Sequence, residues 1–268
     1  MKPMQQIARL LRISRAQMRT MAALIFEYRV TVLLWMLAGI TPLIMMFVWR
    51  NIAEGGAVGG RGPEEFTFYF LMTFLVTQCC QVWVIWNISF FVTMGTYTIH
   101  LLRPYDPWLT ELMENICANV MRLPINLAIV MIGLTVSGTW HLIDPARLPA
   151  FLLSVMLAWQ IMFNFDYVIG LAVLWTERIK AAEAWLYVML YCLGGALFPL
   201  DLLAPDMRML IELTPFPWMV SFPMALLDGS AVDPWRGFAM QALWIVIPVC
   251  AHRILWRRGL KFFGAVGG

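Results

Sequence analysis

Long apolar runs separated by short polar segments make up most of this chain. A helix needs roughly 20 apolar residues to cross a bilayer, and six stretches come close to that length. The clearest is bracketed by Arg29 and Arg50, and the longest run without a charged residue or histidine extends from Phe66 to Ile99. The pattern predicts an all-α polytopic membrane protein with transmembrane helices at residues 30–49, 68–88, 123–140, 148–175, 184–200 and 237–251.

The composition agrees with this pattern. Hydrophobic residues make up 61% of the chain and charged residues 13%, whereas soluble domains have about 25% charged residues. A soluble protein of 268 residues would not cover its surface with so few charges. An ordinary soluble enzyme and a disordered chain are therefore excluded, and with a net charge of only +3 nucleic acid is not an expected partner.

The positions of Lys and Arg predict the orientation. Six spans place both termini on one side, and 14 of the 19 Lys and Arg residues fall on that side. Cytoplasmic loops are enriched in these residues, so both termini are expected in the cytoplasm. The residues expected on the outer side are Arg50, Arg61, Arg147, Arg208 and Arg236.

Residues 4–29 contain no Pro or Gly and have a helical pattern. Four arginines recur at spacings of three and four, which places them in one stripe of a helix. Such a stripe is typical of an interfacial helix whose cations face anionic lipid headgroups. A solvated helix packed on a partner protein is the alternative. The stripe consists of Arg9, Arg12, Arg15 and Arg19.

The segment after the second span, residues 97–114, is predicted to be a rigid cytoplasmic elbow. Pro104 and Pro107 end helices because each lacks an N–H and restricts the residue before it. The polar and aromatic groups between them favour either a docking surface for a partner or a plain connector. These candidate docking residues are His100, Arg103, Tyr105 and Asp106.

Residues 201–235 are too apolar for a free loop and are interrupted too often by proline for a span. Broken elements at membrane depth must be buried in protein or line a cavity. A re-entrant or interfacial pair of short helices on the outer side, before the last span, fits this segment.

Asp166 is the one acid well inside an apolar run. Ionisable groups within a membrane are costly and are candidates for function. About 27 Å of helix separates Asp166 from the start of its span, so a cap or an interhelical hydrogen bond near the inner interface is the alternative. Trp83 and Trp86 are candidates for a transport path that takes a flat or cationic apolar compound, although packing in the core or against lipid also explains them.

Motifs for an ATPase or a metalloenzyme are absent from the sequence. A P-loop requires Gly-x-x-x-x-Gly-Lys followed by Ser or Thr, and Lys2, Lys180 and Lys261 all lie in other contexts. There is no HExxH or GxSxG motif, and none of the five cysteines is accompanied by other residues that could ligate a metal. We therefore expect no catalytic site, metal or cofactor in this chain.

Several motifs follow one another in a characteristic order and spacing. They are the basic N-terminal helix, Leu-Leu-Arg-Pro-x-x-Pro (101–107), Gly-Ala-Leu-Phe-Pro-Leu-Asp-Leu-Leu-Ala-Pro (195–205), Thr-Pro-Phe-Pro (214–217), Phe-Pro-Met-Ala-Leu-Leu-Asp-Gly (222–229) and the tail 256–268. Together they resemble the permease subunit of ABC-2 type exporters, most closely the branch that includes viologen-exporter-type systems. The resemblance covers nearly the whole chain. One departure lies in the tail, where Phe262-Phe263-Gly264 stands in place of a basic-aromatic-acidic run.

The resemblance implies a six-span permease in a bacterial inner membrane that pairs with a second permease, either the same chain or a sister. A separate cytoplasmic ATP-binding subunit, which holds ATP and Mg²⁺, would dock on the elbow and drive export of an amphipathic, lipid-like or drug-like substrate. Alternatives are a lipid floppase or polymer exporter, and a non-transporting anchor for a cytoplasmic ATPase. The outer hairpin would form a gate from Phe198, Pro199, Asp201, Pro215 and Pro217.

Overall fold

A computed structural model gives the architecture. Every regular element in the described part of the chain is helical, and an isolated bridge between Val58 and Arg61 is the sole β contact there. This confirms the predicted all-α class. The structure describes residues 12, 14–20, 22–23, 27, 39–102, 106–175, 179–231 and 233–259.

The α-helices are α3 (Thr41–Glu54), α4 (Pro63–Cys79), α5 (Val84–Thr93), α6 (Tyr97–Leu101), α7 (Pro107–Ser137), α8 (Leu148–Gly170), α9 (Lys180–Leu193), α10 (Pro205–Glu212), α11 (Ser221–Asp228) and α12 (Pro234–Gly259). Short 3₁₀ turns lie between them: η1 (Thr139–Leu142), η2 (Leu171–Leu174), η3 (Leu200–Leu202) and η4 (Phe216–Trp218).

Proline and glycine set many of these boundaries. Proline lies in the first turn of α3, α4, α7, α8, α10 and α12, where its missing N–H has no intrahelical partner to lose. Gly138 ends α7 in the left-handed conformation, with φ of 70°, which glycine adopts without a steric penalty. Gly195, with φ of 94°, turns the chain after α9.

Four segments are long and apolar enough to cross a membrane: Pro63–Thr93, Pro107–Ser137, Leu148–Leu174 and Pro234–Gly259. A shorter apolar helix spans Ala181–Leu193. The multi-pass membrane architecture is thus confirmed. The described part of the predicted first span begins at Gly39, and the total of six crossings stays a prediction.

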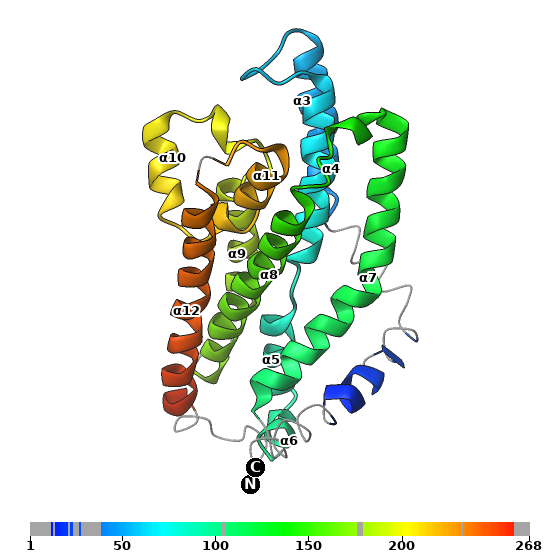
Figure 1. Ribbon diagram of the computed structural model, residues 1–268. Coiled ribbons are helices and arrows are strands. Elements are labelled where there is room, and N and C mark those ends of the chain that lie inside the picture. Colours follow the sequence, from blue (N-terminus) through cyan, green and yellow to red (C-terminus); the bar gives the residue numbers. More distant parts are fainter. Residues whose placement is uncertain are drawn as a thin grey trace.

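The long helices run side by side, with α4 in the middle of the bundle (Figure 1). In the most apolar window of Pro63–Thr93, 83% of residues are buried, compared with 17% in α12. The α3–α4 turn, η1, α10 and α11 lie at one end of the bundle, and α6 and the last turn of α12 lie at the other (Figure 1). These two groups are the segments that the charge pattern assigns to opposite sides of the membrane.

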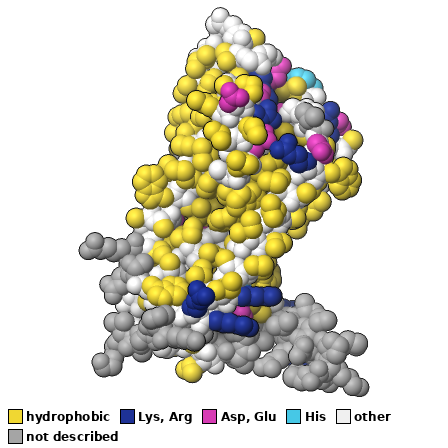
Figure 2. Space-filling model, turned by 90° about the vertical axis from the view of Figure 1, so that its left-hand side faces the viewer, with side chains coloured by type: hydrophobic (Ala, Val, Ile, Leu, Met, Phe, Trp, Pro, Cys, Tyr) yellow, Lys and Arg dark blue, Asp and Glu magenta, His cyan; other side chains and the backbone are white. Residues whose placement is uncertain are grey.

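The surface of the bundle also has the character of a membrane protein. On the face shown in Figure 2, a broad hydrophobic band separates charged side chains that gather near the two ends. Exposed apolar side chains such as Phe47, Val136 and Met156 are 60%, 84% and 69% accessible. Residues of this kind face lipid at no cost.

Several helix boundaries differ from the predicted span boundaries. The helix predicted over 68–88 is broken after Cys79 and resumes at Val84. Gly194 and Gly195 end the fifth span at Leu193, whereas the prediction extended it to residue 200. The helix that contains the predicted third span begins at Pro107, well before residue 123, and its first turns carry buried polar residues.

Candidate functional site

The break between α4 and α5 is the least regular backbone inside the bundle. The helical hydrogen bonds stop after the Cys80 N–H, which donates to Val76, and resume at the Trp83 carbonyl, which accepts from Asn87, although no Pro or Gly occurs between them. Buried backbone N–H and C=O groups must be satisfied in some other way. Side chains from α7, α8 and α9 provide those partners.

Asp166 on α8 holds the first turn of α5. Its Oδ2 accepts hydrogen bonds from the backbone N–H groups of Val84, at 2.8 Å, and Ile85, at 3.1 Å. The side chain is fully buried. A carboxylate at this position complements the positive end of the α5 dipole and satisfies two N–H groups that have no intrahelical acceptor.

Arg122 on α7 holds the other side of the break. Its Nη2 donates to the backbone carbonyl of Gln81 at 3.0 Å, and its Nη1 donates to Oε1 of the same residue at 2.6 Å. The neighbouring Asn119 donates from Nδ2 to the carbonyl of Cys79 at 3.2 Å. A cation and an amide thus satisfy carbonyls at the negative end of α4.

Two further side chains complete the break. The Tyr187 hydroxyl on α9 donates to the Val82 carbonyl and accepts from the Val82 N–H, both at 3.0 Å. Asn115 Oδ1 accepts from the Trp83 N–H at 3.2 Å. The break is therefore a defined structure that three helices hold in place.

The helix break and its partners were not predicted from the sequence. The α7 partners belong to a stripe of polar residues spaced by three and four, which is one face of a helix. That spacing is the signal that would have revealed it. Glu111 falls within the predicted elbow and Arg122 directly precedes the predicted third span, and both are buried, at 2% and 3% exposure. The stripe consists of Glu111, Asn115, Asn119, Arg122 and Asn126.

A cavity of about 230 Å³ lies beside the break. Its wall is mixed, with aromatic rings, neutral hydrogen-bonding groups and one carboxylate. The lining residues are Gly39, Thr77, Gln78, Gln81, Val82, Trp83, Glu183, Tyr187, Leu190 and Tyr191. Such a set can enclose a small polar group inside an apolar bundle.

A second charged cluster lies at the α10 end of the bundle. Arg61 is paired with Asp201 at 3.1 Å and with Asp228 at 3.2 Å, and its guanidinium lies over the ring of Tyr69 at 5.4 Å. Burial opposes the charged form of Arg61, but the two carboxylates outweigh this effect and raise its pKa. The cluster joins the α3–α4 turn to η3 and α11.

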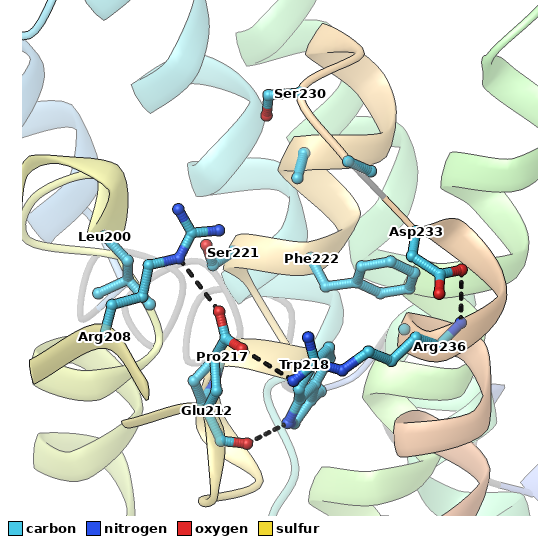
Figure 3. Close-up of a pocket in the computed structure, with 13 residues that line it drawn as sticks. Leu200, Arg208, Glu212, Pro217, Trp218, Ser221, Phe222, Ser230, Asp233 and Arg236 are labelled. Atoms are coloured by element: carbon cyan, nitrogen blue, oxygen red, sulfur yellow. Dashed lines mark hydrogen bonds and ion pairs between the residues drawn. The ribbon is translucent and has the colours of Figure 1, made fainter. Parts of the chain in front are cut away.

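Beside it lies a cleft of about 210 Å³ (Figure 3). Glu212 accepts from Arg208 at 3.1 Å and from Arg236 at 3.2 Å, and its backbone carbonyl accepts from the indole of Trp218 (Figure 3). Asp233 accepts from the backbone N–H of Arg236 at the start of α12. These bonds tie α10 to α12 at the rim of the cleft.

The candidate docking residues have different surroundings. His100 is nearly buried, and its ring packs against the rings of Phe91 and Tyr97, with centroids 4.4 Å and 5.8 Å away. Burial raises the pKa of the Tyr97 hydroxyl. Asp106 is exposed and caps α7 by accepting from the Trp108 N–H at 2.9 Å. Arg103 and Tyr105 lie outside the described residues.

The structure separates the two candidate path tryptophans. Trp83 lines the cavity. Trp86 is 38% exposed and stacks on Phe90 with ring centroids 5.4 Å apart, and it is not among the residues that line the cavity.

The predicted gate residues do not share one surface. Pro199, Pro215 and Pro217 are buried and Phe198 is half-buried, so these four pack the outer segment. Asp201 is exposed and belongs to the Arg61 cluster.

The N-terminal arginine stripe is described in part. Arg12, Arg15 and Arg19 are exposed, and Arg9 lies outside the described residues. The helix contacts α7 through a 3.2 Å hydrogen bond between Gln17 and Thr110.

Among the described residues, no group of three His, Cys, Asp or Glu side chains is placed to hold a metal ion. The five cysteines are free thiols. A family model described as ABC-2 family transporter protein matches residues 19–267. No curated protein matches the chain.

Proposed function

Because the chain belongs to the ABC-2 family of transporter proteins, we propose that it is the membrane-spanning permease subunit of an ATP-driven exporter of amphipathic, lipid-like or drug-like compounds. It pairs with a second permease, either another copy of this chain or a sister chain. A separate ATP-binding subunit supplies the energy by binding and hydrolysing ATP with Mg²⁺.

The observation that carries this proposal is the cavity beside the broken helix. An anchor that does no transport needs no polar cavity in its membrane-spanning part, and each polar group there costs free energy. Discontinuous helices that line polar cavities are a recurring way to build transport sites. The break and the cavity therefore favour a transporter over an anchor.

The position of the elbow supports a mechanical connection between the ATP-binding subunit and the helix break. Helix α5 runs about 15 Å from the break to the corner that α6 and the start of α7 form. At one end α5 is held by Asp166, and at the other it leads into the elbow. We propose that the ATP-binding subunit docks on this elbow in the cytoplasm, and that its movement reaches the break through α5.

The experiment is coexpression with the ATP-binding subunit encoded nearest to this gene, followed by reconstitution into inside-out vesicles. We expect ATP-dependent uptake of a fluorescent amphipathic dye, and no uptake with a hydrolysis-deficient ATP-binding subunit. Arg103→Glu on the elbow should reduce both copurification and stimulated hydrolysis. Arg208→Glu at the opposite end serves as the matched charge reversal and should change neither.

The alternatives predict other results from the same vesicles. A lipid floppase would move a fluorescent phospholipid between leaflets in place of the dye. A non-transporting anchor would bind the ATP-binding subunit and move neither probe. Unchanged copurification with Arg103→Glu would remove the docking role of the elbow.

A further inference from the structure

The arginines at the two ends of the bundle differ in their partners. The five arginines that the charge pattern assigns to the outer side all form ion pairs, at 3.1–3.4 Å. At the other end, Arg253, Arg257 and Arg258 on α12 are exposed, and no described carboxylate pairs with any of them. We call these three residues the basic end of α12. Their charges are available to an anion that is not part of the described chain.

The exposed face of α12 is apolar along most of its length and basic toward its last turn. Its exposed apolar side chains recur at spacings of three, four and seven residues, and the basic end continues this spacing, so both lie on one face. About 27 Å of helix separates Trp235, which is 84% exposed at the outer end, from Arg253. That length is close to the thickness of about 30 Å of a bilayer hydrocarbon core, which places the basic end at the level of the lipid head groups. The apolar side chains are Leu243, Val246, Ile247 and Ile254, which are 44–55% exposed.

The helix dipole explains only part of this cluster. Arg257 and Arg258 lie in the last turn of α12, where cations complement the negative end of the dipole. Arg253 lies one turn earlier, and like charges four residues apart repel each other on a helix surface. An anion bound between Arg253 and Arg257 would offset this repulsion.

The basic end is held in a fixed position. Gly259 lies so close to Leu174 that a Cβ added to the glycine would come within 2.6 Å of the leucine side chain, which fixes the last turn of α12 against η2. A carboxylate near this part of α12 belongs to Asp106, which interacts electrostatically with His252. Asp106 caps α7, and the face of α12 that carries the three arginines is exposed.

We propose that the basic end of α12 binds the head group of an anionic phospholipid in the cytoplasmic leaflet. A guanidinium group matches the geometry of a phosphate, to which it can donate two hydrogen bonds, and arginines beside a membrane-spanning helix attract anionic lipids. An acyl chain of the lipid lies along the apolar part of the same face. A zwitterionic lipid carries the same phosphate, but its own ammonium group compensates the charge. This inference goes beyond the proposed function, because it holds for a transporter and for an anchor alike.

The test measures which lipid contacts this face. Cys250 is exposed on α12, three residues before Arg253. In a protein whose other four cysteines are replaced by alanine, a bimane attached to Cys250 is quenched by brominated acyl chains beside it. The protein is placed in phosphatidylcholine nanodiscs that contain a small, equal fraction of either brominated phosphatidylglycerol or brominated phosphatidylcholine. We expect phosphatidylglycerol to bind about fivefold more tightly, with a preference that falls as salt screens the charges.

Matched variants assign the preference to the basic end. Arg253→Gln, Arg257→Gln and Arg258→Gln together should reduce the ratio of the two affinities to about one, and three lysines in the same positions should keep most of it, because the charge is retained. Arg15→Gln with Arg19→Gln removes two exposed cations from the N-terminal helix, which lies on the opposite side of the bundle from α12 (Figure 1), and should leave the ratio unchanged.

A second label position controls for the bulk lipid. In a protein without its five cysteines, a bimane on Val136→Cys lies on the exposed apolar face of α7, away from the basic end. Phosphatidylglycerol and phosphatidylcholine should quench it equally.

Three results would contradict a lipid site. They are equal quenching of the Cys250 label by the two lipids, an undiminished preference in a monodisperse triple glutamine variant, and loss of the preference when the ATP-binding subunit is added. In the last case the arginines would serve an acidic surface of that protein. A preference that persists in the complex supports the lipid site even in vesicles that show no transport, a result that would count against the permease function alone.

Discussion

The molecule contains two charged networks that differ in what their charged groups bind. In one network the charged side chains form hydrogen bonds with backbone groups, and in the other they form ion pairs with each other. At the helix break, Arg122 and Asp166 are buried, and each donates to or accepts from peptide groups. At the α10 end, Arg61 is bonded to the carboxylates of Asp201 and Asp228 near the surface. The first network replaces missing helical hydrogen bonds, whereas the second joins segments that already have their own.

The difference has an energetic consequence. Removing one partner from a buried charged network leaves unsatisfied groups and typically costs about 3–5 kcal/mol. Exposed ion pairs contribute about 0–1 kcal/mol. The break should therefore be the more sensitive region of the two, although it contains fewer ion pairs.

The largest effect is expected from Arg122→Met. The substitution keeps the apolar stem of the side chain but removes the guanidinium, which leaves the Gln81 carbonyl and side chain without their donors, so the free energy of unfolding should fall by about 3–5 kcal/mol. Thermal unfolding in nanodiscs measures this loss. Arg122→Lys should recover only part of it, because an ammonium cannot reproduce the forked geometry of a guanidinium.

An intermediate effect is expected at Asp166. Asp166→Ala removes the acceptor for two buried N–H groups and should cost about 2–4 kcal/mol, since each unsatisfied group costs about 1–3 kcal/mol. Asp166→Asn keeps an acceptor oxygen, so its loss should be about half as large. Equal losses in the two variants would show that the charge, and not the hydrogen bond, holds α5.

The Asn variant also sharpens the functional question. If Asp166→Asn leaves both assembly and transport unchanged, Asp166 acts only as the cap of α5. Loss of transport in a stably assembled Asp166→Asn protein would assign a role to its charge.

The smallest effect is expected at the α10 end. Arg61→Ala should cost about 1–2 kcal/mol, because the pair is partly exposed and screened, and high salt should reduce the difference. A group with a raised pKa loses its contribution only as the pH rises through that pKa. Since the pKa of Arg61 is raised above its usual value of 12.5, the loss should be constant between about pH 6 and pH 10.

Arg50→Ala is the control for that measurement. Arg50 pairs with Glu54 one turn away, with both side chains about half exposed, so its replacement should cost no more than about 0.5 kcal/mol. A loss as large as that of Arg122→Met in either outer variant would contradict the comparison between the two regions.

The sequence predicts most of the fold because its signals are local. Hydrophobic length gives the long helices, and the start of α8 at Leu148 coincides with the predicted boundary. The helix break was missed because its causes are not local. Residues 80–83 contain no helix breaker, and the groups that stabilise them come from α7, α8 and α9.

Individual site residues follow the same rule. Asp166 was identified because an acid within an apolar run stands out in the sequence. In the structure this residue of α8 caps the first turn of α5, in agreement with the alternative role of a cap. Glu183 and Tyr187 were not identified, since nothing in the sequence indicates that α9 packs beside residues 78–83. Only the packing of the helices brings these side chains together.

The most direct measurement for the central claim is the accessibility of the cavity to water. In a protein without its five cysteines, Tyr191→Cys places a thiol on the cavity wall and Val136→Cys places one on the exposed apolar face of α7. A membrane-impermeant cationic thiol reagent should label position 191 in the assembled transporter, with a rate that changes when ATP is added, and should leave position 136 unlabelled. Equal labelling of the two positions, or none at 191 with and without ATP, would contradict a transport cavity at the broken helix.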